Sequence, residues 1–406
     1  MKYMLIVGDG MADEKIEELG GKTPLEYAAC ENMARIAGGE LGRVRTCPVD
    51  MPPGSDVAFL SLLGHDPKTC YRGRSPLEAA GEGVALAEDE VSFRMNLATI
   101  SGDYQNGVMA SYNGDGIDGE DARAVASSLL ENPEFAALME KAQMRITVTP
   151  TFRHVAVVKA TDEPFTLTPP HDIAGRAIDA YQPKGQKAAL LRALQETAHR
   201  ALQNHPVNLR RVKEGHMPAN AVWFWGAGRA TALESFYGQF GKTGTAVSAV
   251  PLVRGIAWLS GLKAPRVPGA TGALDTNYAG KVEAALHALL EEGDDFALLH
   301  LEAPDDLSHL GDRDGKVESI RRLDERMVKP ALSALEASGE DFRILLMPDH
   351  YTLLRTQTHD GTPVPYAIYD SRRPGEPRLF CEDTCADKPV LANGVELLKR
   401  FFGTDS

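Results

Sequence analysis

The chain is poor in cysteine and has fewer cationic than anionic side chains, and each shortage excludes a class of protein. Five cysteines in 406 residues, odd in number and scattered, argue against a disulfide framework and favour a reducing compartment. Lys and Arg number 43 against 57 Asp and Glu, which gives a net charge of −14. Such a field excludes a nucleic acid or an anionic membrane surface as the default partner, and an anionic substrate would need local cations or metals.

Long apolar runs, internal repeats and low-complexity tracts are also missing. No window approaches the roughly 18 apolar residues that a membrane-spanning helix needs. The first apolar run, "YMLIV", is short and leads directly into "GDG", so it predicts a buried strand rather than the core of a signal peptide. We therefore expect a cytoplasmic protein with no membrane partner and no nucleic-acid partner.

The sequence does contain an alternation of short apolar strands and helical patterns. The expected strands lie in "KYMLIV", "AVWFWGAGRA", "DFALLHLEAPDD" and "FRILLMPDHYT", and the expected helices span about 229–238, 276–292 and 314–338. Continuous apolar strands between helices predict an α/β fold, with a mostly parallel sheet and helices on both faces. Ligand sites in such sheets lie beyond the carboxyl ends of the strands.

Residues 85–212 have a different pattern of strand-like and helical segments from the rest of the chain. Strand-like pieces in "VSFRMNLATI", "QMRITVTP" and "RHVAVVKA" accompany helical patterns near 120–140 and 188–204, with loops rich in Pro and Gly. This pattern predicts an inserted α+β domain. It leaves residues 1–84 and 213–406 as a discontinuous sheet domain.

Ser55 stands after a stiff "PPG" turn and opens an apolar run that ends at Gly64. As a structural residue it would be the N-cap of a short buried helix over 55–63, with Gly64 at the C-terminal end. The free N–H groups at a helix N-terminus also stabilise anions and phosphates. The same serine could therefore serve as a nucleophile, and the rest of the chain has to decide between the two roles.

Aspartates and histidines gather behind three of the expected strands. In "APDDLSHLGD", Asp305 and His309 are four residues apart, so a helix that begins there would place both on one face. Taken singly, each residue also fits an ordinary role, as a turn or capping aspartate or as a loop histidine. Together they suit Mn²⁺, Zn²⁺, Co²⁺ or Mg²⁺, and two such metals would clamp a phosphoryl group and activate the Ser55 hydroxyl. The set is Asp9, Asp305, His309, Asp349, His350 and His359.

These motifs resemble a known family. "GDGMAD", "PPGSDVAFLSLLG", "APDDLSH" and "PDH", with the later His359, are similar to the archaeal-type, 2,3-bisphosphoglycerate-independent phosphoglycerate mutases of the alkaline phosphatase superfamily, and the likeness extends over nearly the whole chain. The resemblance implies an alkaline-phosphatase-like fold with an inserted lid domain, two divalent metals with Mn²⁺ the first expectation, and a transiently phosphorylated serine. By matching motif, one metal would be held by Asp9, Ser55, Asp349 and His350, and the other by Asp305, His309 and His359.

The same resemblance implies the reaction. The Ser55 alkoxide would take the phosphoryl group of 3-phosphoglycerate, and the retained glycerate would take it back on its other hydroxyl to give 2-phosphoglycerate, a step of glycolysis and gluconeogenesis that needs no 2,3-bisphosphoglycerate primer. Such a mutase needs a lid that excludes water, and residues 85–212 are the candidate. The cationic candidates for binding substrate oxygens, in this segment and just before it, are Arg72, Arg74, Arg94, Arg153, His154, His171 and Lys184.

Some motifs differ from those of this family and leave the identity of the phosphoryl acceptor open. "EAPDDLSH" and "VPGATGALDTNY" look closer to a bacterial branch proposed to phosphorylate homoserine in threonine biosynthesis. Met95 stands where a cysteine is common, and Thr362 precedes "PVP" where an aspartate is expected. The alternatives are therefore a homoserine kinase-like phosphotransferase on the same serine and metals, a simple phosphatase, and a non-catalytic metal-binding protein, which the intact ligand set argues against.

Overall fold

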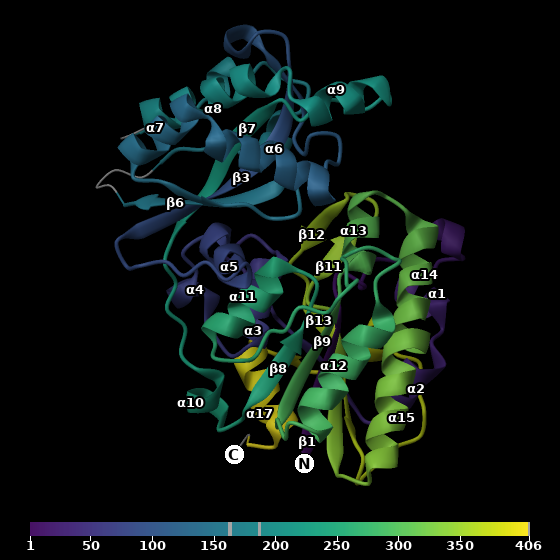
Figure 1. Ribbon diagram of the computed structural model, residues 1–406. Coiled ribbons are helices and arrows are strands. Elements are labelled where there is room, and N and C mark those ends of the chain that lie inside the picture. The colour runs from purple at the N-terminus through teal and green to yellow at the C-terminus, as the bar shows by residue number, and fades with distance from the viewer. Residues whose placement is uncertain (161–164, 186–187, 405–406) are drawn as a thin grey trace. The chain divides into compact units, whose positions relative to one another are not determined.

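The computed structural model describes residues 1–160, 165–185 and 188–404, and it divides into two compact units (Figure 1). Unit 1 comprises Met1–Tyr71 and Ala232–Ser406, and unit 2 comprises Arg72–Thr231. Among the helices of the described residues, none is long and apolar enough to cross a membrane.

Unit 2 is wider at both ends than the insertion expected over residues 85–212. At its start, α5 (Arg74–Gly81) packs on β3 (Glu90–Ser101), and at its end β7 (Ala221–Arg229) pairs with β3 in antiparallel fashion. The run "AVWFWGAGRA" therefore belongs to the sheet of unit 2, and its assignment to the parallel sheet is wrong. A continuous apolar strand has the same sequence pattern in either sheet. Only the strand with which it pairs shows to which sheet it belongs.

A seven-stranded sheet forms the centre of unit 1. Its neighbouring strands β8, β9, β1 and β10 are parallel, whereas β13 runs antiparallel to both β10 and β2. The predicted α/β fold with a mostly parallel sheet is confirmed. In spatial order the strands are β14 (Val390–Leu391), β2 (Glu40–Val44), β13 (Val364–Asp370), β10 (Phe342–Met347), β1 (Lys2–Gly8), β9 (Phe296–Leu301) and β8 (Gly244–Val247).

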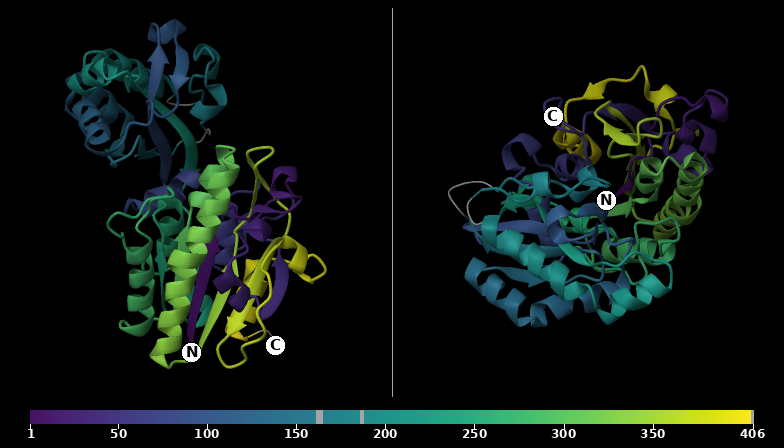
Figure 2. Two further views of the ribbon diagram at one scale, coloured as in Figure 1. Left: turned by 90° about the vertical axis from the view of Figure 1, so that its right-hand side faces the viewer. Right: turned by 90° about the horizontal axis from the view of Figure 1, so that it is seen from above.

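Helices cover both faces of this sheet, because alternate residues of its strands are buried on opposite sides (Figure 1). Met4 and Ile6 of β1 belong to a core with α12, α14 and α15, and the left view of Figure 2 shows the light green α14 and α15 running along the purple β1. On the other face, the Tyr3 ring packs edge-on against Phe401 and Phe402 of α17. The helices of the first face are α12 (Tyr278–Leu290), α14 (Arg313–Leu323) and α15 (Lys329–Ser338), and those of the second are α3 (Ser55–Leu62), α11 (Pro251–Leu259) and α17 (Gly394–Phe402). The shorter helices of unit 1 are α1 (Pro24–Ala28), α2 (Glu31–Ile36), α4 (Pro67–Cys70) and α16 (Glu382–Cys385).

Two of the three predicted helices are confirmed, one as α12 and one as α14 and α15 joined by a π-helical turn. The helix expected over 229–238 is wrong. Pairing with β3 extends β7 as far as Arg229, and only α10 (Phe236–Phe240) is helical, with Gly241 ending it at a φ of 62°.

The parallel strands of unit 1 end side by side at one edge of the sheet. Gly8 of β1 is in register with Leu301 of β9, and Val7 is in register with Met347 of β10. Three segments follow these ends: the loop after β1, the helix α13 (Ala303–His309), and a hairpin of β11 (Tyr351–Leu353) and β12 (Thr358–Asp360). The aspartates and histidines singled out in the sequence come from these segments.

Unit 2 is an α+β structure built on an antiparallel sheet, in which β3 pairs with β4, β6 and β7, and β5 pairs with β6. Phe93, Met95 and Leu97 of β3 face a core that includes α6, α7 and α8, and α5 packs on the other face. Its further elements are β4 (Val108–Ser111), α6 (Gly119–Glu131), α7 (Pro133–Ala142), β5 (Arg145–Thr147), β6 (Arg153–Lys159), α8 (Ala188–Leu202) and α9 (Pro206–Lys213).

A buried polar network braces the loop that follows β1. The Lys316 Nζ of α14 lies 2.8 Å from Asp13 Oδ2, with both side chains 0% exposed, and it also donates to the backbone carbonyl of Thr352. Glu382 accepts a hydrogen bond from the Asp13 N–H at 3.0 Å and another from the Thr23 hydroxyl at 2.5 Å. The loop after β1 is thereby tied to the β11–β12 hairpin.

Replacing Lys316 by Met would leave the Asp13 carboxylate buried without its cation. We expect the free energy of unfolding of unit 1 to fall by about 3–5 kcal/mol, measured by urea denaturation. The matched control is Lys15→Met, because Lys15 pairs with Asp383 at 2.7 Å with side chains 55% and 54% exposed, and such pairs contribute less than about 1 kcal/mol. Equal losses in the two variants would contradict this account of the network.

Burial raises the pKa of the Glu382 carboxyl from 4.5 to about 7. The folded protein therefore keeps a proton that the unfolded chain releases, so this carboxyl stabilises the fold below pH 4.5, and the contribution is lost as the pH rises through about 7. For Glu382→Gln we expect the free energy of unfolding, relative to the unaltered protein, to rise by about 2 kcal/mol between about pH 5 and pH 8. Glu283→Gln, on the exposed side of α12, is the control, and a Glu382→Gln curve parallel to that of the unaltered protein would refute the shift.

Candidate metal centre

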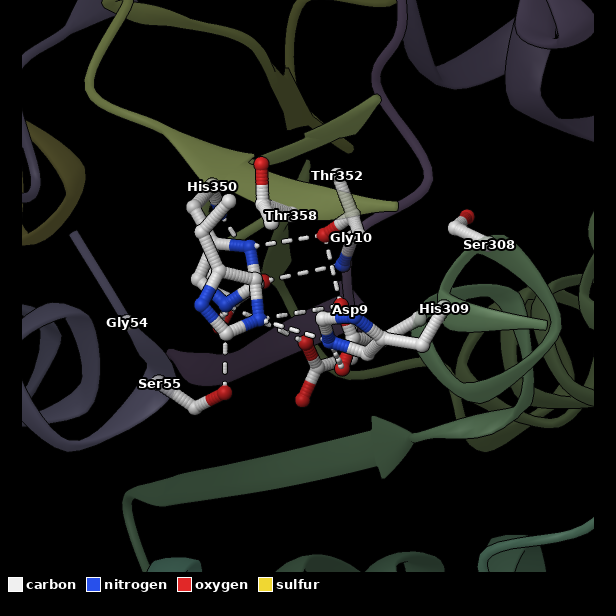
Figure 3. A network of polar contacts seen from close by, with 12 residues as sticks. Asp9, Gly10, Gly54, Ser55, Ser308, His309, His350, Thr352 and Thr358 are labelled. Carbon is white, nitrogen blue, oxygen red and sulfur yellow. Dashed lines mark hydrogen bonds and ion pairs between the residues drawn. The ribbon is translucent and has the colours of Figure 1, made fainter. Parts of the chain in front are cut away.

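The residues singled out as metal ligands lie together at the carboxyl edge of the unit 1 sheet (Figure 3). They come from several separate segments of the chain, and the parallel register of β1, β9 and β10 brings three of those segments to one place. Asp9 follows β1, Asp305 and His309 lie on α13, Asp349 and His350 follow β10, Ser55 begins α3, and His359 lies on β12.

Among the residues that the structure describes, four groups of donor atoms have all their members within 4.8 Å of one another, and two of the four consist only of predicted ligands. The first group consists of Asp305, His309 and His359: the His309 Nε2 lies 3.2 Å from Asp305 Oδ2 and 2.9 Å from the His359 Nε2. The second consists of Asp9, Asp305 and His350. Asp305 is therefore within reach of both groups, whereas the motifs had assigned it to one.

The Ser55 hydroxyl is directed at this cluster and does not cap its own helix. α3 begins at Ser55 and its N-cap is Gly54, so the interpretation of Ser55 as an N-cap is wrong. The Ser55 Oγ lies 3.1 Å from the His350 Nε2, and the residue is only 8% exposed. Gly64 follows the helix at a φ of 91°, as its predicted place at the C-terminal end requires. The serine is the first residue of a helix, beside backbone N–H groups that have no partner within the helix.

Asp9 and Asp349 are fully buried carboxylates with incomplete coordination. The Asp349 Oδ1 accepts the N–H groups of Gly10 at 3.0 Å and His350 at 2.9 Å, and the His300 Nε2 lies 3.0 Å from Asp9 Oδ2. Their other oxygens, Asp9 Oδ1 and Asp349 Oδ2, accept no hydrogen bond from any residue that the structure describes. Burial and the neighbouring charge of Asp349 raise the pKa of Asp9 well above its usual value. A divalent cation would fit both unsatisfied oxygens and remove this penalty.

The group around Asp305 has the opposite electrostatic character. Although burial opposes its ionisation, contacts with His309 and His359 hold the pKa of Asp305 well below its usual value. The contact with Asp305 in turn raises the pKa of His309 to about 9, and the His309 Nδ1 is oriented by the Gln357 carbonyl at 2.8 Å. In the metal-free protein a proton on His309 thus occupies the place that a cation would take among these three donors.

Two buried side chains of the site were missed in the sequence. The Nε2 of His300, on β9, contacts Asp9, and the Nδ1 of the same ring lies 2.8 Å from the Ser248 Oγ. The Thr352 Oγ1 lies 2.5 Å from Asp305 Oδ1 and 3.1 Å from the His350 Nδ1. A histidine inside the apolar strand "FALLHL", and a threonine two residues after His350, were the available signals.

In unit 2, three of the predicted cationic residues gather around one carboxylate, Glu78. The Arg94 Nε lies 2.8 Å from Glu78 Oε2, and its guanidinium stands 4.1 Å from the ring centre of Trp225. The Arg74 Nε lies 2.8 Å from Glu78 Oε1. Although burial opposes ionisation, Arg94, Arg74 and Arg153 hold the pKa of Glu78 below its usual value. Three arginine side chains therefore lie close to the carboxylate of Glu78.

The other cationic candidates of unit 2 differ in their placement. His171 packs edge-on against Trp225 with ring centres 5.2 Å apart, which places it beside the same cluster. His154 is 1% exposed and its Nδ1 accepts the Thr149 N–H at 3.1 Å, and burial lowers its pKa to about 4. Successive strand residues point to opposite faces, so His154 lies on the face of β6 opposite to Arg153, and its role in substrate binding stays a prediction. Arg72 and Lys184 are exposed.

Comparisons with known proteins agree on one family. A family model described as 2,3-bisphosphoglycerate-independent phosphoglycerate mutase matches residues 37–208. A mutase of that name from Methanothrix thermoacetophila is 44% identical, with 91% of each chain covered, and a probable one from Geobacter sulfurreducens is 43% identical, covering 91% of this chain and 90% of its own. The solved structure of a cofactor-independent phosphoglycerate mutase from Thermoplasma acidophilum is 25% identical and superposes with a TM-score of 0.61 over the whole of both chains.

The repulsion between the buried carboxylates generates a prediction. In Asp349→Asn the amide oxygen can still accept the N–H groups of Gly10 and His350, but the charge beside Asp9 is gone. We expect the metal-free variant to be more stable than the metal-free unaltered protein by about 1–2 kcal/mol, and to lose the further stabilisation that Mn²⁺ gives. Thermal unfolding with and without chelator measures both effects. A metal-free variant that is less stable would show that the two carboxylates do not repel each other.

Proposed function

Because the chain belongs to the 2,3-bisphosphoglycerate-independent phosphoglycerate mutases, we propose that it interconverts 3-phosphoglycerate and 2-phosphoglycerate through a phosphoserine at Ser55. The observation that carries this proposal is the position of the Ser55 hydroxyl, which is turned away from its own helix and toward a cluster of buried carboxylates and imidazoles. A serine that served only as a cap would face the helix.

We also propose that the site holds two divalent cations, with Mn²⁺ the first expectation and Zn²⁺, Co²⁺ or Mg²⁺ the alternatives. The unsatisfied oxygens of Asp9 and Asp349 and the convergence of two imidazoles on Asp305 support this number. When bound, the cations would neutralise the phosphoryl oxygens and favour the ionised form of the serine hydroxyl. By matching motif, one would be held by Asp9, Ser55, Asp349 and His350. The other would be held by Asp305, His309 and His359, whose donor atoms lie within 4.8 Å of one another.

The groups of the chain itself account for the remaining steps. The Ser55 Oγ attacks phosphorus, so that an Oγ–P bond forms while the bond from phosphorus to the 3-oxygen of the substrate breaks. The N-terminus of α3 stabilises the charge of the phosphate that Ser55 then carries. The retained glycerate presents its 2-oxygen to the same phosphorus, a bond from phosphorus to that oxygen forms, the Oγ–P bond breaks, and Ser55 is restored. In each half of the reaction the attacking hydroxyl loses its proton and the leaving oxygen takes one, so the protons balance.

Unit 2 supplies the cations that this reaction needs for the substrate. We propose that Arg74, Arg94, Arg153 and His171 bind carboxylate and phosphate oxygens, and that unit 2 acts as the lid that excludes water. Arg94 is the strongest candidate, because Glu78 and the Trp225 ring hold its guanidinium in one orientation and lower the entropy lost on binding. The partner is a small phosphorylated substrate, and the expected location is the cytoplasm.

The test uses protein stripped of metal and reconstituted with Mn²⁺. Conversion of 3-phosphoglycerate, coupled to enolase without 2,3-bisphosphoglycerate, is expected for the unaltered protein, and Ser55→Ala should lower it by about 10³-fold or more. Ser308→Ala is the matched control, because that buried hydroxyl of α13 donates to the Pro304 carbonyl of its own helix, and it should retain activity within about threefold.

Two parallel assays separate the alternatives. Homoserine with candidate phosphate donors tests for O-phosphohomoserine, and free phosphate is measured with 3-phosphoglycerate as substrate. Phosphorylation of homoserine without mutase activity would reassign the acceptor while retaining the serine and the metals. Release of free phosphate alone would identify a phosphatase, and the absence of a phosphorylated Ser55 in the quenched reaction would overturn the proposed intermediate.

A further inference from the structure

One hydroxyl joins the two groups of ligands described above. Thr352 lies on β11, is 0% exposed, and stands opposite His359 in the register of the hairpin. Its Oγ1 lies 2.5 Å from Asp305 Oδ1 and 3.1 Å from the His350 Nδ1 (Figure 3). The hydroxyl thus contacts one residue of each predicted metal set, and it is not itself a member of either set.

The chemistry of the three partners fixes the direction of both hydrogen bonds. An ionised carboxylate only accepts hydrogen bonds, so the Thr352 O–H donates to Asp305. A hydroxyl has a single hydrogen, so toward His350 its oxygen can only accept. The His350 Nδ1 must then carry the proton, and in the neutral imidazole the Nε2 is left with its lone pair. That Nε2 is the atom that faces Ser55 at 3.1 Å and Asp349 at 3.1 Å.

Two hydrogen bonds fix the backbone of Thr352 and thereby restrict the position of its hydroxyl. Its N–H donates to the Ala12 carbonyl at 3.2 Å, and its carbonyl accepts the Lys316 ammonium at 2.8 Å. Gly10 closes the third side: at a φ of 58°, a Cβ added there would lie 2.5 Å from the Thr352 Oγ1 and 2.6 Å from Asp305 Oδ1. Only glycine leaves room for this hydroxyl and its carboxylate partner.

We propose that Thr352 is a positioning residue that couples the two halves of the metal centre. It sets the tautomer of His350, so that Nε2 is available to a divalent cation, and the same hydroxyl fixes the carboxylate of Asp305 for the second cation. Groups that orient metal ligands in this way commonly change metal affinity by about 10–100-fold when they are removed. The distinctive consequence is that the loss of one hydroxyl weakens the binding of both ions. The inference rests on the two-metal site of the proposed function.

The test measures metal binding directly. Metal-free protein is titrated with Mn²⁺ alone, and free Mn²⁺ is followed by electron paramagnetic resonance, which yields both dissociation constants without any assay of activity. In Thr352→Val, which keeps the shape and removes the hydroxyl, we expect both constants to rise by about 10–100-fold. Thr352→Ser restores the hydroxyl and should bring both constants back toward those of the unaltered protein.

A matched control is provided by Thr245 at the far end of the sheet. Its buried hydroxyl donates to the carboxylate Asp294 Oδ2 at 2.7 Å, so Thr245→Val removes the same kind of bond away from the metal centre. It should leave both constants unchanged. Thermal unfolding of the metal-free variants shows whether each remains folded, and Thr352→Ala, which also lacks the hydroxyl, takes the place of the valine variant if that variant does not fold.

The outcomes separate this inference from the proposed function. Unchanged constants in Thr352→Val, weakening of one ion only, or failure of the serine variant to restore binding would each overturn the coupling role, even in an active mutase. Two Mn²⁺ ions that bind normally and respond to Thr352 as expected, in a protein without mutase activity, would support the coupling role and overturn the proposed function instead.

Discussion

The candidate metal centre of unit 1 depends on two buried carboxylates, which lie at the ends of neighbouring parallel strands. Asp9 and Asp349 lie where water cannot reach them, and each leaves one oxygen without a hydrogen-bond donor among the described residues. Such an arrangement costs free energy, which shows in the raised pKa of Asp9. It persists because the cores on the two faces of β1 and β10 fix the strands in register and leave the carboxylates no route to solvent. A cation bound between the two carboxylates would remove this unfavourable free energy.

The remaining features of the site can be understood as ways of holding that strained arrangement. The N–H groups of Gly10 and His350 fix one oxygen of Asp349, and His300 fixes one oxygen of Asp9. Behind them, the buried ammonium of Lys316 donates hydrogen bonds both to Asp13 in the loop after β1 and to the Thr352 carbonyl in the β11–β12 hairpin, so the two ligand-bearing segments are linked. Preorganisation of this kind lets a metal bind without first ordering its ligands, which preserves affinity for the ion.

In unit 2, cationic side chains gather around one carboxylate, Glu78. Arg94 lies inside the antiparallel sheet unit, where Glu78 and the Trp225 ring restrict its guanidinium, and Arg74 shares the same carboxylate. Although burial opposes ionisation, the guanidinium groups of Arg94, Arg74 and Arg153 all lower the pKa of the one carboxyl of Glu78, within a protein whose overall charge is −14.

The sequence by itself determined the fold class and predicted which aspartates and histidines would gather at one edge of the sheet, because both depend on local signals. Apolar strands that alternate with helices predict a parallel sheet, and an Asp or His directly behind such a strand must emerge at its carboxyl edge. Tertiary structure alone decided the rest. It placed "AVWFWGAGRA" in the second sheet, since pairing with β3 is a long-range choice that the strand's own residues do not encode. It placed Gly54 rather than Ser55 at the N-cap of α3 and brought the Ser55 hydroxyl to His350, a residue far away in the sequence. It sent His154 and Arg153 to opposite faces, and it brought Thr352 between two ligand sets, because hydrogen bonds between distant segments form only after the sheet has set their distances.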